Sequence, residues 1–278
     1  MSGKGNKERT FSIFKRKYRN GDEIKERKNI NIVMKISPTS APKLPSKLKL
    51  ALTGSLVGPV VDSIHNQCLL EYHKGKIEIP ITFTEPGLII ETSFFIPPLL
   101  ALAYVVLGGL LPKLIGSIVP EESETVHFKN LKAKAILAIS STAIIVKISE
   151  YLQTHDISSL CAHPITFLSV SEINLVIMVI ASVLQWAVLD RTVVSLITAT
   201  IVSIGGPLSE LPFIANDFWV YIPDAADYFP LHDLAFVPED YRCLALSSIT
   251  GPCYFAVTMD AIALARFFDS EEETLINR

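Results

Sequence analysis

The sequence predicts an all-α, polytopic membrane protein folded as a bundle of six transmembrane helices. Its 278 residues are 49% hydrophobic and only 19% charged, an apolar balance that is unusual for a soluble domain. Several stretches run for about a membrane thickness with hardly any charge, whereas helices of soluble proteins alternate apolar stripes with charged faces. Basic residues also gather on alternate connections, as membrane topology requires.

The first element is a basic tail. Residues 1–46 are polar and basic, lack sustained helical periodicity and end in a Pro/Ser-rich stretch, so we expect a mostly disordered cytosolic tail. The first apolar run begins near residue 50, behind this charge, so a cleavable signal of ordinary shape is not expected. We place orientation and solvation ahead of specific lipid binding as the role of the basic charge.

Six apolar runs follow, each close to the ~20 residues that a spanning helix needs. Asp190 and Arg191 alone separate the fourth from the fifth, which predicts a tight hairpin, with one overlong helix as the alternative. A transmembrane domain is therefore expected over residues 47–268, followed by a short acidic cytosolic tail, 269–278. The runs are 48–70, 92–115, 131–152, 172–189, 192–214 and 243–267.

The connections between the runs give the orientation. The loop at 153–171 has no Lys or Arg, and the loop at 215–242 is rich in acids and aromatic residues. Lysines instead collect around the loop at 116–130: Lys113, Lys129, Lys132 and Lys134. Positive charge favours the cytosolic side, so this alternation predicts an even number of spans with both termini in the cytosol.

Ionisable residues inside the runs are candidates for function, because each costs about 2.5–3.5 kcal/mol at a helix centre. Lys147 and Glu150 stand three residues apart, and we favour an ion pair over a transport relay by about three to one. Asp62 and His65 are expected to reach the lumenal interface and are assigned no role.

Two further acids are harder to place. Glu210 follows Gly205-Gly206-Pro207, which indicates a kink with an interface carboxylate, the alternative being the broken helix of a transporter. Asp260 lies deep in the last run, where we expect a partner inside the bundle such as a hydroxyl or Lys147, and a proton site is the alternative.

Motifs for catalysis or metal binding do not occur. There is no HExxH, GxSxG or phosphate-binding loop, and the histidines are scattered. The cysteines, Cys68, Cys161, Cys243 and Cys253, lie far apart and form neither a disulfide framework nor a zinc pattern. We expect a non-enzyme without a metal or cofactor.

Two stretches resemble the INSIG family. In SFFIPPLLALAYVVLGGLLP, residues 93–112, paired aromatics precede Pro-Pro, a small-residue run and a closing proline. Phe94 and Phe95 stand where the family usually has Trp-Trp, and structural positions match at Pro97, Pro98, Gly109 and Pro112. In QWAVLDRT, residues 185–192, the family's Trp, Asp and Arg positions are held by Trp186, Asp190 and Arg191.

The resemblance implies a non-catalytic adaptor of the endoplasmic-reticulum membrane that binds sterol-sensing-domain proteins, such as HMG-CoA reductase, in a sterol-dependent way. It assigns Asp190 and Arg191 to partner binding, so that Asp190→Ala should abolish partner capture without loss of folding. A solvated hairpin cap is an equally good reading of Asp190.

The same resemblance assigns Trp186, Phe94 and Phe95 to a surface that faces lipid or sterol. Interfacial anchoring is as good a reading of Trp186. A bound sterol or other lipid is the only ligand expected. The rival function is a small solute or ion transporter lined by Glu210, Asp260 and the Lys147–Glu150 pair.

Overall fold

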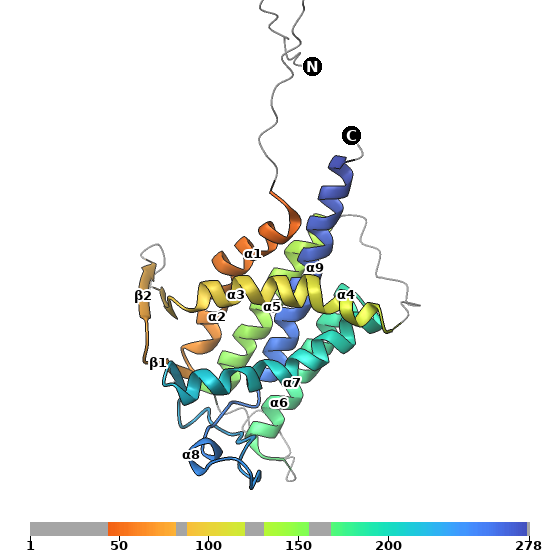
Figure 1. Cartoon of the computed structure of the whole chain (residues 1–278). Coiled ribbons are helices and arrows are strands. Elements are labelled where there is room, and N and C mark those ends of the chain that lie inside the picture. The colour runs from red at the N-terminus through yellow and green to blue at the C-terminus, as the bar shows by residue number, and fades with distance from the viewer. Residues whose placement is uncertain (1–43, 82–87, 120–130, 156–167, 277–278) are drawn as a thin grey trace, which may run out of the picture. The chain divides into compact units, whose positions relative to one another are not determined.

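The structure is a computed structural model that describes residues 44–81, 88–119, 131–155 and 168–276 (Figure 1). Nearly all of the predicted basic tail therefore lies outside the described residues. The helices are α1 (Ser46–Leu56), α2 (Gly58–Asn66), α3 (Ile96–Val105), the π-helix η1 (Val106–Leu110), α4 (Leu111–Gly116), α5 (Leu131–Thr154), α6 (Val170–Leu189), α7 (Val193–Ala215), α8 (Glu239–Arg242) and α9 (Thr250–Ile276).

The fold is mostly helical, as predicted, and the described residues add two antiparallel ribbons that the prediction lacked. Strand β2 (Lys76–Ile81) pairs with β3 (Leu88–Ser93), and Lys76 bridges Glu78 at 3.1 Å and Glu91 at 3.0 Å. Strand β1 (Leu70–Tyr72) pairs with β4 (Trp219–Tyr221). The first ribbon has a short alternating pattern in the sequence, but the second joins segments far apart in the chain, which no local pattern reveals.

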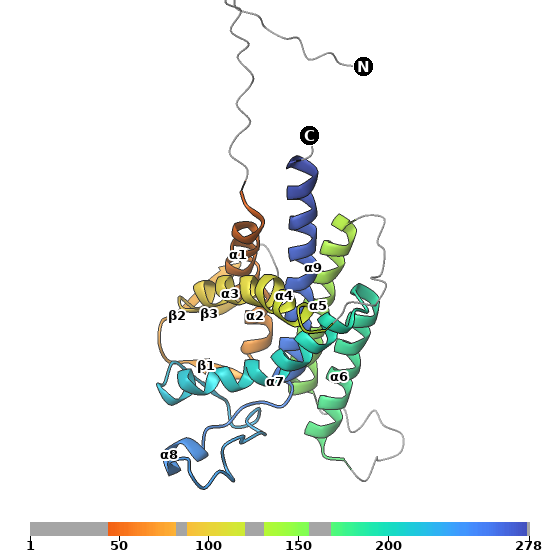
Figure 2. The same ribbon diagram turned by 45° about the vertical axis from the view of Figure 1, so that its right-hand side comes forward.

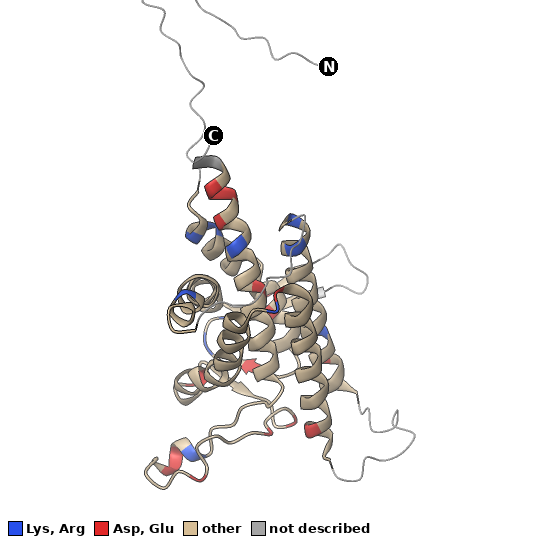
Figure 3. Ribbon diagram, turned by 90° about the vertical axis from the view of Figure 1, so that its right-hand side faces the viewer, with Lys and Arg blue, Asp and Glu red and all other residues tan. Residues whose placement is uncertain are grey.

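Among the described residues, four helical segments are long and apolar enough to cross a membrane: Ile96–Gly116, which joins α3, η1 and α4, and the helices α5, α6 and α7. In the most apolar 18-residue stretch of each segment, only 17–39% of the residues are buried. Much of the apolar surface therefore faces outward, as contact with lipid requires. Charged residues are sparse along the middle of the helices (Figure 3). The chain is a helical membrane protein.

The last predicted span is the central helix, α9. It packs against α1, α5, α6, α7 and η1, and nearly every residue from Gly251 to Ala265 is buried or close to it. Asp260 and Arg266 lower its hydropathy, and α9 is not among the four apolar segments. A helix enclosed by other helices needs no lipid-facing stripe and can carry such residues. It runs on to Ile276, through most of the predicted acidic tail.

The first predicted span is broken into α1 and α2 at Val57. Pro59 explains the break, because it has no N–H to offer the carbonyl of Ser55 and its ring crowds that turn. Pro112 acts in the same way on the second span, where the wide π-turn η1 lies directly before it. Proline therefore makes both of the first two predicted spans irregular.

The two ends of the described chain meet at one end of the bundle. The backbone N–H of Ser46 donates to Glu272 at 3.0 Å, and Lys49 pairs with Glu271 at 3.0 Å (Figure 1). An even number of crossings agrees with this arrangement. The helices are not all parallel, because α3 and α7 cross the α5–α9 pair steeply in both ribbon views (Figure 2).

Gly108 and Gly109 provide a matched test of helix packing. A Cβ atom at Gly108 would collide with the backbone of Ala261 on α9, whereas a Cβ at Gly109 meets nothing within 4 Å. We predict that Gly108→Ala lowers the free energy of unfolding by about 1–3 kcal/mol through overpacking, while Gly109→Ala stays within about 0.5 kcal/mol. Thermal unfolding of both variants in detergent measures this, and equal stability would contradict the α9 contact.

Candidate functional site

A cavity of about 360 Å³ lies between α2, α3, η1, α7 and α9, a volume within the ~300–1,000 Å³ typical of ligand sites. Most of its lining is apolar, including Val61, Leu99, Leu100, Leu107, Phe213 and Val257. Leu102 on α3 and Ser209 on α7 also line it and are exposed, so the cavity reaches the outer surface between these two helices. A molecule could enter there from the lipid.

Glu210 on α7 lies in the polar part of the cavity and is only 8% exposed, so the predicted interface position is wrong. Its Oε1 accepts a hydrogen bond from Tyr254 at 2.8 Å, and its Oε2 accepts from Tyr221 at 2.9 Å and from Trp219 Nε1 at 3.4 Å. The β1–β4 ribbon positions Trp219 and Tyr221 for these bonds. Burial raises the pKa of Tyr221 well above its ordinary value, so this hydroxyl keeps its proton and donates.

Asp62 on α2 is the second acid that lines the cavity. Its Oδ2 accepts from Asn66 Nδ2 at 2.6 Å and from Tyr72 at 3.2 Å, and all three residues line the cavity. Burial raises the pKa of Tyr72, which therefore also donates. Asp62 and Glu210 thus accept hydrogen bonds from neutral groups that come from α2, α9 and the β1–β4 ribbon.

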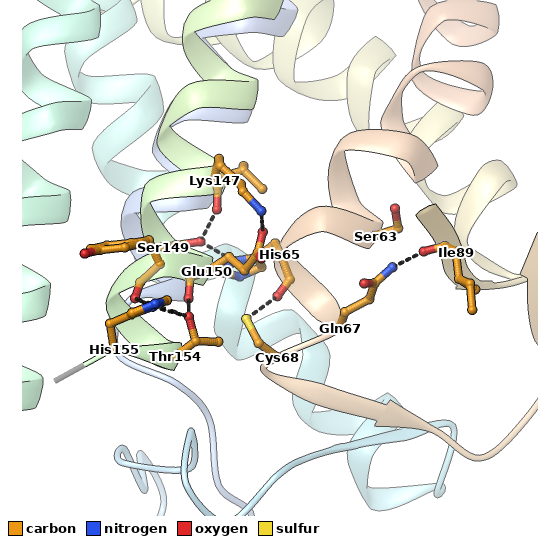
Figure 4. A network of polar contacts seen from close by, with 12 residues as sticks. Ser63, His65, Gln67, Cys68, Ile89, Lys147, Ser149, Glu150, Thr154 and His155 are labelled. Atoms are coloured by element: carbon orange, nitrogen blue, oxygen red, sulfur yellow. Dashed lines mark hydrogen bonds and ion pairs between the residues drawn. The ribbon is translucent and has the colours of Figure 1, made fainter. Parts of the chain in front are cut away.

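His65 lies one turn after Asp62, and the prediction that it reaches the surface is wrong, because it is only 6% exposed. Figure 4 shows it pointing from α2 toward Ser149 on α5, with Nδ1 2.7 Å from the serine Oγ. Ser149 Oγ lies 2.6 Å from the carbonyl of Val146 and gives its single proton to it, and we therefore assign the tautomer of His65 in which Nδ1 donates to Oγ. Nε2 is then an acceptor, and no described residue pairs with it.

The other ionisable candidates from the sequence do not line the cavity. Lys147 and Glu150 form an ion pair at 2.5 Å and do not line the cavity, which confirms the ion-pair interpretation (Figure 4). Asp260 on α9 accepts a hydrogen bond from Tyr104 at 2.8 Å, the hydroxyl partner that was expected.

The turn between α6 and α7 is tight, and the alternative of one overlong helix is wrong. Arg191 has φ 61°, the left-handed conformation that ends helices, and its N–H and that of Asp190 both bond to the carbonyl of Trp186. Thr192 then caps α7, because its Oγ1 accepts the N–H of Ser195 at 3.2 Å.

Asp190 is buried within this turn, at 1% exposure. Its carboxylate pairs with Arg266 of α9 and with Lys134 of α5 at 3.7 Å, and it accepts from Thr192 Oγ1 at 2.6 Å. The carboxylate thereby joins α5, the turn and α9. Groups of this chain thus enclose the carboxylate, whereas the side chain of Arg191 beside it is exposed.

The three predicted lipid-facing residues differ in their surroundings. Phe94 is 55% exposed, whereas Phe95 packs edge-on against Phe218 with ring centroids 4.9 Å apart. Trp186 is half-buried, and its Nε1 donates to the carbonyl of Thr192 at 3.0 Å, which closes the turn.

Among the predicted structural residues, Pro97 and Pro98 lie in the first turn of α3, where a missing N–H costs no hydrogen bond.

The sequence analysis missed the cavity and its polar group. One signal was present, because Asp62, His65 and Asn66 are spaced three and four residues apart and so share one face of α2. The partners of that face come from α5, α7, α9 and the β1–β4 ribbon. Nothing in the local sequence associates them.

No protein-family profile and no curated protein matches the chain. Two solved structures do. A cross-linked trimer of MvINS is 14% identical, with a TM-score of 0.54 over 80% of this chain and 93% of MvINS. MvINS from Mycobacterium vanbaalenii, described as a mycobacterial Insig homologue, is 15% identical, with a TM-score of 0.52 over 79% of this chain and 92% of that one. Likeness at this identity shows the fold alone, and the chain therefore has an Insig-like fold.

Proposed function

We propose that the chain is a membrane regulator that binds sterol-sensing-domain proteins such as HMG-CoA reductase in a sterol-dependent way, and so controls their retention or stability. The observation that carries this proposal is an Insig-like fold built around an apolar cavity that opens toward lipid. The proposal includes residence in the endoplasmic-reticulum membrane, six crossings and cytosolic termini. It involves no catalysis.

The cavity suits a ligand with a large apolar body and a small polar head. Its apolar walls would hold the body of a sterol, and the polar group around Asp62 and Glu210 would receive the head. A ligand shifts a protein between two conformations only if it binds one of them more tightly. Sterol would therefore have to bind more tightly to the arrangement of α3 and α7 that the partner recognises.

The partner surface that we propose is centred on Arg191, with Phe94 as a separate lipid-facing contact. Arg191 is exposed at the end of the bundle where Asp190 joins three elements. Asp190 would then contribute indirectly, by holding the turn in the shape that presents Arg191. The transporter alternative receives less support, because of its proposed groups only Glu210 lines the cavity.

The sterol dependence can be tested by affinity purification. We expect a sterol-sensing-domain protein to co-purify with the tagged full chain from solubilised, sterol-replete membranes and to decrease severalfold after sterol depletion. Mass spectrometry of the purified material measures this. Equal recovery under both conditions, or recovery of no such protein, would count against the proposal.

Asp190 and Arg191 should behave differently when they are replaced. Asp190→Ala removes the carboxylate that pairs with Arg266 and Lys134, and breaking a buried pair of this kind costs on the order of 3 kcal/mol. We therefore expect lower thermal stability together with loss of partner capture, in contrast to the sequence-based expectation of intact folding.

Arg191→Ala should leave stability nearly unchanged and weaken partner capture roughly tenfold, as loss of one charged contact does. Lys113→Ala, which removes another exposed positive charge, is the matched control. It should change neither the thermal stability nor the amount of partner captured. Thermal unfolding and quantitative co-purification are measured on the same preparations. Full partner capture by Arg191→Ala would exclude the Arg191 surface.

A further inference from the structure

The two carboxylates and the imidazole that line the cavity all offer hydrogen-bond acceptors to a ligand. Asp62 and Glu210 are carboxylates, and His65 Nε2 carries a lone pair because Nδ1 holds the ring proton. Each is at the wall of the same cavity. A ligand head that satisfies these three residues must donate hydrogen bonds.

The negative charge of the two carboxylates has no cationic partner in the described part of the chain. Within the described ranges, every hydrogen bond to Asp62 or Glu210 comes from a neutral group, namely Asn66, Tyr72, Trp219, Tyr221 or Tyr254. Lys and Arg are missing from the described lining, and the described ion pairs involve other acids. Burying a carboxylate without a counter-charge is costly, so the cavity favours a cation.

The donors around each carboxylate also favour its ionised form. Three N–H or O–H groups point at Glu210 and two at Asp62, and hydrogen bonds donated to a carboxylate stabilise its charge. Both acids line the same cavity, so a cation bound there would serve both.

We propose that the cavity binds an amphiphile whose head is a protonated amine, with Asp62 and Glu210 as its counter-charges and His65 Nε2 as a further acceptor. An ammonium group has three N–H donors and no acceptor, which matches three acceptor residues. A hydroxyl supplies one donor, and a carboxylate or phosphate head is repelled. The inference rests on the proposed function only in treating the cavity as a lipid site.

The test compares three ligands that share a twelve-carbon alkyl tail and differ only in the polar head group. Dodecylamine, dodecanol and dodecanoate are titrated into the purified full chain in a neutral detergent, and binding is followed by thermal stabilisation and by calorimetry. We expect the amine to bind roughly tenfold or more tightly than the alcohol, because charge-assisted hydrogen bonds are about twice as strong as neutral ones. The carboxylate should bind most weakly.

The acids are then replaced. The double variant Asp62→Asn, Glu210→Gln keeps the size of both side chains and should lose the amine preference while it still binds the alcohol. The control variant Asp224→Asn, Asp233→Asn removes two exposed acids outside the cavity and should keep the preference. The single variants Asp62→Asn and Glu210→Gln, each expected to reduce the preference in part, serve if the double variant does not fold.

Equal binding of the amine and the alcohol to the unaltered chain would overturn the inference, and so would an amine preference that survives both replacements. Binding of none of the three probes would also overturn it. None of these outcomes affects sterol-dependent capture of a partner, which the separate purification measures. The two proposals therefore fail independently.

Discussion

The enclosure of α9 by the other helices is the constraint on which the rest of the structure depends. Lipid tails are as apolar as the helices, so burial of apolar surface drives helix association only weakly in a membrane, and close packing must supply the attraction. Glycines provide that closeness on both sides. Gly108 lies against Ala261, Gly206 lies against Tyr254, and Gly251 lies against Ser203.

Polar side chains then join the helices that surround α9. Thr142 on α5 donates to the carbonyl of Ala256 at 3.2 Å, and Ser182 on α6 donates to the carbonyl of Pro252 at 3.0 Å. The Asp190–Arg266 pair closes one end of this arrangement. In a low-dielectric interior such contacts specify which helices meet, because an alternative packing would leave the same groups without partners.

The cavity exists because two segments depart from regular helix beside α9. The break at Val57 turns the first span away from a straight path, and the π-turn before Pro112 alters the second span. Side chains of α2 and α3 consequently do not fill the space next to α7 and α9, and the β1–β4 ribbon brings Trp219 and Tyr221 to it. Proline and a small ribbon thus determine where a ligand can bind.

Apolar length and polar breaks are local properties, so the amino-acid sequence was enough to predict a helical membrane protein, the position of most of its helices and the turn from α6 to α7. It also predicted the Lys147–Glu150 pair, since residues three apart on a helix are neighbours. The remaining features required the three-dimensional packing. Which distant segments pack together decides three features: the burial of Asp190, the β1–β4 ribbon and the cavity that Asp62, His65 and Glu210 share. The side-chain contacts that select this packing leave no periodic pattern in the sequence.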